Sequence, residues 1–211
     1  KPHVGRELME GLKEIYSKPG LLWLFIMALI AMFFIMPVAA LFPLMTLDHF
    51  KGTTYMMSIV EIAWGIGMFL GGVIIGHRRL GSYKIILINL MYLLLGLSFL
   101  FSGILPPSGF AVFATITALG GIAFTVYSGS FTVVMQTMVR PAALGRVFSL
   151  YSSITLLPSM IGLLATGYVA DTIGIGNAFI ISGSSIAILG LGAFLIPPVR
   201  AIVRDEIRIK N

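Results

Sequence analysis

The sequence predicts an all-α membrane protein, a bundle of six transmembrane helices. Of its 211 residues, 58% are hydrophobic and only 10% are charged, whereas soluble domains carry about 25% charged residues. The mean hydropathy is +1.02. The apolar residues gather in runs of about 20, which is the number that a helix needs to cross a hydrocarbon core about 30 Å thick.

The expected spans follow one another with short polar gaps between them. We place them at residues 21–45, 54–75, 85–105, 110–138, 147–170 and 177–196. Pro37 and Pro43 interrupt the first span, where they form either a bend that gates a pathway or a static kink that shapes packing. A polar turn is expected to follow at residues 46–53.

The spans divide the chain into three parts. Residues 1–19 are expected to end a central cytoplasmic loop, residues 20–199 to form the transmembrane domain, and residues 200–211 to form a cytoplasmic tail. The chain does not begin with Met, and its start lacks the apolar core of a signal peptide. We therefore expect residue 1 to be a cut point within a longer chain.

An amphipathic helix is expected at residues 4–16. Its apolar stripe consists of Val4, Leu8, Leu12, Ile15 and Tyr16. Charged residues, among them Glu10, Lys13 and Glu14, are expected over the rest of its surface. Such a helix lies either at the membrane surface, with the stripe among the lipid headgroups, or docked on other cytoplasmic segments.

The positive-inside rule predicts the orientation of the spans. Six spans place both termini on one side. With the termini in the cytoplasm, thirteen of the fourteen Lys and Arg residues lie there, because only Lys51 falls outside. The net charge of +6 therefore reflects membrane topology, and no nucleic-acid partner is expected. The absence of cysteine excludes thiolate chemistry, and three scattered histidines predict no metal site and no cofactor.

The second span carries the most informative residues. Glu61 lies within it, and a carboxylate at bilayer depth costs a few kcal/mol unless it faces protein or water. The glycine pairs at 67 and 71 and at 72 and 76 have the four-residue spacing that permits close helix packing. The span ends in a basic cluster, which marks a cytoplasmic exit and consists of His77, Arg78, Arg79 and Lys84.

Two further patterns concern the arrangement of the spans. The second span ends in Gly72 and Gly76, and the fifth, three spans later, ends in Gly167 and Asp171. This similarity predicts two three-helix inverted repeats. The fourth span is rich in hydroxyl side chains, which favours one side of it facing a protein interface or an aqueous cavity.

Four motifs together carry a resemblance to a known family. They are EGLK at 10–13 followed by PGLL at 19–22; Gly71, Gly72 and Gly76 before the basic turn; Pro141 followed by LGRVFS at 144–149; and Gly167, Ala170, Asp171 and Gly174. In this order and spacing, they make residues 6–200 resemble the C-terminal half of a major facilitator superfamily transporter. The branch that they resemble includes the macrolide-efflux proteins and the enterobactin exporter.

Two positions depart from the family's pattern. Ala142 stands where the branch usually has an acid after the proline, and Gly76 stands where the superfamily's loop motif has an aspartate. The first departure weakens any charge lock between Arg146 and an acid of its own loop. The second leaves Arg78 and Arg79 without the anionic partner of that motif.

The resemblance implies a twelve-helix transporter whose two six-helix halves rock about a central cavity. It implies proton-coupled efflux of drug-like or siderophore-like amphipathic small molecules across a bacterial inner membrane, with protons, lipid and a missing N-terminal half as partners. An uptake permease of the same fold stays open as an alternative. An enzyme or assembly factor is disfavoured, because no intramembrane His or Cys accompanies the carboxylate in the spans.

Candidate site residues follow from these interpretations, and none of them is expected to be catalytic. Glu61 is the candidate for proton or substrate coupling, with a packing carboxylate as the alternative. The candidates to line the cavity are Met57, Trp64, Ser128 and Phe131, each of which has a structural role as its alternative. Conformational or loop-motif roles are expected for Arg78, Arg79, Arg146 and Asp171.

Overall fold

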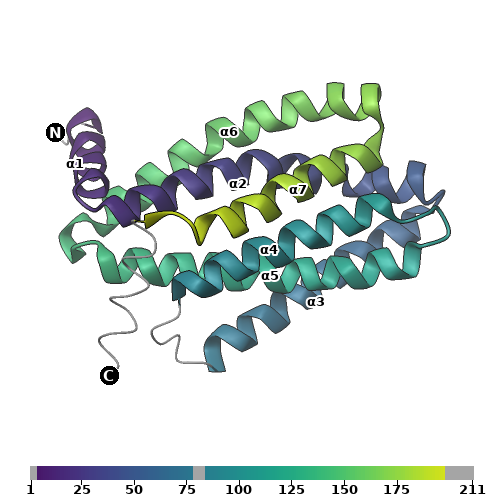
Figure 1. Cartoon of the computed structure of the whole chain (residues 1–211), viewed down its shortest axis with the longest axis horizontal. Coiled ribbons are helices and arrows are strands. Elements are labelled where there is room, and N and C mark those ends of the chain that lie inside the picture. The colour runs from purple at the N-terminus through teal and green to yellow at the C-terminus, as the bar shows by residue number, and fades with distance from the viewer. Residues whose placement is uncertain (1–3, 78–83, 198–211) are drawn as a thin grey trace.

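The computed structural model describes residues 4–77 and 84–197, and this part of the chain is helical apart from short turns (Figure 1). The helices are α1 (Val4–Tyr16), α2 (Pro19–Leu44), α3 (Thr54–His77), α4 (Lys84–Ile104), α5 (Phe110–Met138), α6 (Leu144–Ile173) and α7 (Ile175–Ala193). A π-helical turn, η1 (Met45–His49), continues α2, and a 3-10 turn, η2 (Pro141–Ala143), precedes α6. Within the described ranges, six helices are long and apolar enough to cross a membrane. The predicted six-helix bundle is confirmed.

The first loop is shorter than the sequence predicts. Residues 46–49 belong to η1 and not to a polar turn. The Oγ1 hydroxyl of Thr46 donates to the carbonyl oxygen of Phe42 at 3.0 Å, and Nε2 of His49 lies 2.7 Å from the carbonyl oxygen of Leu105. Because their polar atoms find backbone partners, these residues prolong the helix although their side chains are hydrophilic.

The spans form two triplets, α2–α4 and α5–α7, with matching contacts. Helix α4 packs against α7, α3 against α5, and α2 against α6. In chain order, α2, α3 and α4 correspond to α5, α6 and α7. Exchanging each helix for its counterpart turns the α3–α5 pair into the α6–α2 pair and the α4–α5 pair into the α7–α2 pair. Both of the resulting pairs are also packed. Such an exchange symmetry is what the predicted inverted repeats require.

Glycines permit the closest crossings between helices. A Cβ on Gly67 would lie 2.0 Å from the carbonyl oxygen of Ala118, and the Cβ of a residue at Gly71 would also press on α5. The predicted Gly67/Gly71 face therefore packs on α5. Gly72 and Gly76 differ, because among the described residues no atom outside their own helical turns lies within 4 Å of the position of a Cβ. Between α4 and α7, close approach is permitted by Gly96, Gly183 and Gly190.

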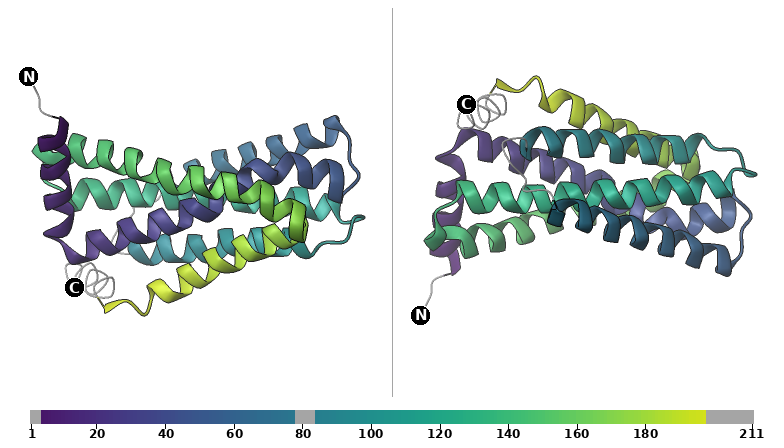
Figure 2. Two further views of the ribbon diagram at one scale, coloured as in Figure 1. Left: turned by 90° about the horizontal axis from the view of Figure 1, so that it is seen from above. Right: turned by 90° about the horizontal axis from the view of Figure 1, so that it is seen from below.

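Helix α1 lies across one end of the bundle and not alongside the spans (Figures 1 and 2). Among residues 9–16 of this helix, Gly11, Glu14 and Ile15 are buried, and the helix packs mainly on α6. Leu12 and Tyr16, which the sequence places on the apolar stripe with Ile15, are 40% and 63% exposed. The docking face therefore shares Ile15 with the apolar stripe but also contains Glu14, whose carboxylate is paired with Arg140 and Lys18.

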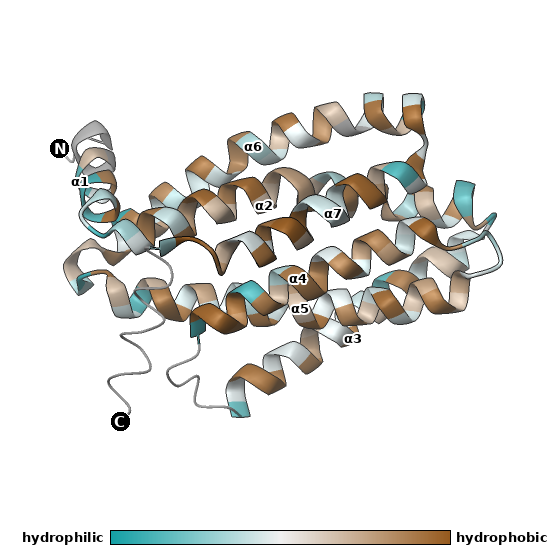
Figure 3. Ribbon diagram, in the orientation of Figure 1, coloured by the Kyte–Doolittle hydropathy of each residue, from teal (hydrophilic) through white to brown (hydrophobic). Residues whose placement is uncertain are grey.

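The outer helices leave much apolar surface uncovered. Figure 3 shows apolar residues along the spans, whereas hydrophilic residues gather in α1 and at helix ends. The most apolar stretches of α3 and α6 are each 17% buried, compared with 56% for α4. Large side chains such as Phe69 and Leu164 are 71% and 79% exposed. These surfaces are suited to contact with lipid or with further helices.

Candidate functional site

Glu61 lies in the wall of an apolar cavity of about 340 Å³ between α2, α3, α4 and α5. Helix α2 contributes Met36, Ala39 and Phe42 to the lining, and α5 contributes Thr117 and Phe124. The Glu61 side chain is exposed, whereas its neighbour Val60 is buried in the core. Among the residues that line this cavity, Glu61 is the one with an ionisable side chain, so a molecule inside would meet an apolar wall with a single carboxylate.

Trp64 stands one helical turn from Glu61 on α3 and lines the same cavity. Its ring lies 5.9 Å from that of Phe42 on α2 and 5.8 Å from that of Phe124 on α5. A Cβ on Gly120 would come within 3.1 Å of the Trp64 ring, so α5 supports the indole closely. This packing fixes an aromatic surface beside the carboxylate, where it can contact an aromatic or cationic group.

Met57 lies next to the cavity, one turn before Glu61. It lines a small hollow of about 20 Å³ that shares Glu61, Val60, Phe42 and Pro43 with the larger cavity. The structure thus brings together three of the predicted site residues, Met57, Glu61 and Trp64, on one stretch of α3.

Ser128 and Phe131 lie elsewhere on α5. Phe131 is 3% exposed, and its ring lies 4.9 Å from that of Tyr151 and 5.8 Å from that of Phe25. It belongs to an aromatic cluster of the core and does not line the cavity with Glu61. Ser128 is exposed on α5 and does not line that cavity either.

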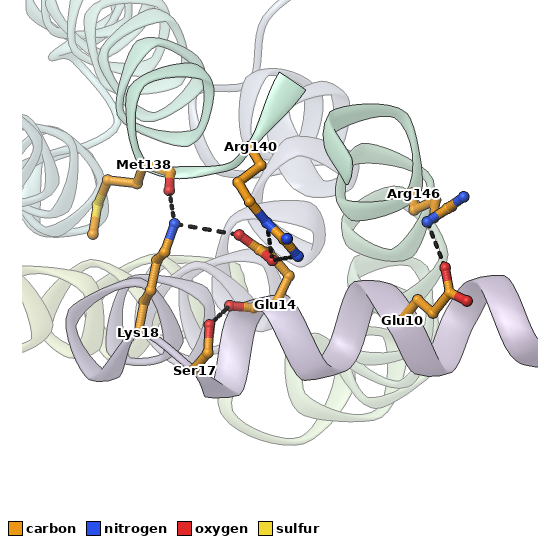
Figure 4. A network of polar contacts seen from close by, with 7 residues as sticks. All are labelled: Glu10, Glu14, Ser17, Lys18, Met138, Arg140 and Arg146. Atoms are coloured by element: carbon orange, nitrogen blue, oxygen red, sulfur yellow. Dashed lines mark hydrogen bonds and ion pairs between the residues drawn. The ribbon is translucent and has the colours of Figure 1, made fainter. Parts of the chain in front are cut away.

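A second polar site joins α1 to the segment between α5 and α6 (Figure 4). The side chain of Glu14 is 5% exposed, and its Oε2 accepts hydrogen bonds from Nε and Nη2 of Arg140 at 3.0 and 2.6 Å. Nζ of Lys18 lies 3.3 Å from Oε1 of Glu14 and also donates to the carbonyl oxygen of Met138. The hydrogen bonds from Arg140 lower the pKa of Glu14 below its ordinary value, although burial opposes this effect.

Arg146 pairs with α1 as well. Its Nη1 donates to Oε2 of Glu10, so an acid from α1 contacts this arginine, although residue 142 of the arginine's own loop is an alanine. Asp171 is exposed near the other end of α6, about 37 Å from Arg146 at 1.5 Å per residue. These two predicted conformational residues therefore do not act on each other directly. Arg78 and Arg79 lie outside the described residues.

Sequence reasoning missed the residues that α2, α4 and α5 contribute to the cavity, together with Val60 and Met68 of α3. Met36, Ala39, Phe42 and Phe99 are as apolar as exposed residues of the same helices, such as Ile30 and Leu90. A helix that is apolar on all sides carries no periodic signal for the face that lines a cavity. Pro43, flagged as a possible bend, was the available hint, and it does line the cavity.

Comparison with known proteins supplies the family. The chain is 37% identical over 203 residues to macrolide efflux protein A of Streptococcus pyogenes, an overlap that covers 95% of this chain and 50% of that protein. It is 40% identical over 164 residues to macrolide efflux protein A of Enterococcus faecalis, covering 77% of this chain and 50% of that protein. It is 34% identical over 130 residues to the MFS-type transporter YfiS of Bacillus subtilis, covering 60% of this chain and 31% of that protein.

Other comparisons give no match. No protein-family model matches the chain, and no solved structure matches it.

The chain spans about half the length of the curated relatives, the macrolide efflux proteins, that it matches over most of its own residues. Its six apolar helices and its similarity to these transporters make it a multi-pass membrane protein. On the same evidence, the chain belongs to the major facilitator superfamily (MFS), in the branch of the macrolide efflux proteins.

Proposed function

We propose that the chain forms the C-terminal half of an efflux transporter that exports amphipathic small molecules, macrolides among them, in exchange for protons. The observation that carries this proposal is the apolar cavity with Glu61 in its wall and Trp64 beside it. A cavity of this composition suits a molecule with a large apolar body and a cationic group. The names of the similar proteins support export over uptake.

In this proposal, Glu61 alternates between two states. The ionised carboxylate attracts the cationic group of a substrate, while the aromatic surface of Trp64 contacts its apolar part. A proton that reaches Glu61 from the outside neutralises the carboxylate, and this weakens its hold on the cation. The proton leaves toward the cytoplasm when the cavity opens there, so each proton that enters releases one substrate molecule.

The other half of the cavity comes from a partner in this proposal. The uncovered apolar faces of α3 and α6 would contact an N-terminal six-helix half of the same transporter, and the two halves would rock to open the cavity on alternate sides. Both termini lie in the cytoplasm of a bacterial cell, following the positive-inside rule. Arg146 and Asp171, near opposite ends of α6, would act on this movement and not on the substrate.

An efflux assay tests the proposal. The chain is co-expressed with the complementary half of the Streptococcus pyogenes protein in a macrolide-sensitive bacterium, and export of a labelled macrolide is followed with and without an uncoupler. We expect Glu61→Gln to remove the uncoupler-sensitive export and Glu61→Asp, which keeps the charge, to retain part of it. Unchanged proton-driven export by Glu61→Gln would show that Glu61 has only a packing role.

A further inference from the structure

A pocket of about 470 Å³ lies between α1 and the segment that joins α5 to α6. Its walls carry four basic residues and two acidic ones, namely Lys13, Lys18, Arg140, Arg146, Glu10 and Glu14. With all six ionised, the pocket has a charge of +2. An anionic group is therefore the ligand that its electrostatics favour.

The basic side chains keep hydrogen-bond donors for such a ligand. Arg140 uses Nε and Nη2 on Glu14, and Arg146 uses Nη1 on Glu10, whereas a guanidinium carries five N–H donors. The two arginine side chains are 77% and 42% exposed, and Lys13 is exposed as well. Arginine recognises phosphate oxygens particularly well, because its planar fork donates two parallel hydrogen bonds.

The pocket lies at the level where the spans end. Helix α2 begins at Pro19 and α5 ends at Met138, and Lys18 bridges these two ends through its bond to the carbonyl oxygen of Met138. From this level, the apolar segments of α2 and α5 both extend toward the opposite end of the bundle. The pocket is therefore placed at the depth of lipid headgroups.

Around its axis, α1 presents three faces in sequence. Gly11, Glu14 and Ile15 form the buried face, and Glu10, Lys13 and Ser17 line the pocket. The next face is apolar and uncovered, since Met9, Leu12 and Tyr16 are 73%, 40% and 63% exposed. At 100° per residue, Lys13 lies between the pocket and this apolar face. A basic pocket thus directly adjoins a surface suited to hydrocarbon.

We propose that this pocket binds the phosphate of an anionic phospholipid, with the acyl chains of that lipid lying along Met9, Leu12 and Tyr16. Free phosphate would satisfy the arginines but would leave the apolar face in water, so the combined surface fits a lipid better. The bound headgroup would contact both α1 and the segment between α5 and α6, and it would hold them at the membrane surface. Lipid binding at this pocket concerns the membrane embedding of the chain and is independent of the substrate and of proton coupling.

Native mass spectrometry of the full chain in a neutral detergent tests the proposal. Phosphatidylglycerol and phosphatidylcholine with identical acyl chains are added in equal amounts, and inorganic phosphate is added in a separate series. We expect a phosphatidylglycerol adduct at least about fivefold more abundant than the phosphatidylcholine adduct, since one Lys or Arg at an anionic surface contributes a factor of about five. Lys13→Gln and Arg146→Gln should each reduce this preference about fivefold.

Lys51→Gln is the matched control, because Lys51 follows η1, which continues α2 at the end remote from Pro19 and the pocket, and it should leave the preference unchanged. Circular dichroism verifies that each variant keeps its helix content. Lys13 is exposed and forms no ion pair with any residue that the structure describes, so its replacement tests the pocket even if Arg146→Gln unfolds α1. Equal binding of the two lipids, a preference that survives Lys13→Gln in the folded chain, or binding of phosphate without binding of phosphatidylglycerol would each overturn the proposal.

Discussion

The crossing of α3 and α5 offers a sharp test of the packing, through replacement of Gly67 by alanine. The new Cβ would lie 2.0 Å from the carbonyl oxygen of Ala118, well inside an ordinary contact, and a backbone oxygen cannot rotate away as a side chain can. Overpacking of this kind costs about 3 kcal/mol, and about 1 kcal/mol is regained because alanine favours the helix more than glycine does. We therefore expect Gly67→Ala to lower the free energy of unfolding by about 2 kcal/mol.

Gly72→Ala provides the control on the same helix. Outside its own helical turns, no described atom lies within 4 Å of its Cβ position. Only the gain in helix propensity therefore acts, and stability should rise by up to about 1 kcal/mol. The assay is reversible unfolding in mixed detergent micelles, monitored by far-UV circular dichroism. The reasoning is refuted if the two variants change stability in the same direction and by the same amount.

Three further predictions concern α1, the aromatic cluster and the turn between α6 and α7. The pKa of Glu14 is lowered in the folded chain. Its ion pairs therefore stabilise the docking of α1 at pH values above the ordinary carboxyl pKa of about 4.5. This stabilisation is lost as the pH falls through the lowered pKa of Glu14. Hydrogen exchange of the α1 amides, corrected for intrinsic rates, should show this loss, and Glu14→Gln should make their protection lower and less dependent on pH. Phe131→Ala should cost about 3–5 kcal/mol of unfolding free energy, and a cost near zero would mean that the ring is not packed in the core. Gly174 has a φ of +88° and a ψ of 153°, so Gly174→Ala should cost about 1–3 kcal/mol; unchanged thermal stability would contradict that backbone conformation.

The spans could be predicted from sequence because hydropathy and length alone require them. Pro19–Leu44 and Thr54–His77 begin and end within two residues of their predicted limits. The turn after α2 was less predictable, since Thr46 and His49 are hydrophilic and yet satisfy their polar atoms on backbone carbonyls. A hydropathy scale describes the side chain alone and does not include the hydrogen-bond partner that the fold provides for it.

The site could be predicted only where a residue is unusual for its surroundings. Glu61 stands out because a carboxylate in a span is costly, and it does line the cavity. Phe131 does not stand out, since a phenylalanine in a span is equally favourable in the core, in a cavity or against lipid. Burial of Glu14 was beyond sequence reasoning as well, because it depends on Arg140, 126 residues away.

The glycines at the close crossings and the residues around the cavity are separate sets. None of Gly67, Gly71, Gly96, Gly183 and Gly190 lines the space beside Glu61. Mutations that reshape the cavity can therefore accumulate over evolution while the backbone framework stays intact. In the proposed transporter, a scaffold of this kind would let a few side-chain changes alter the range of compounds that the cavity accepts.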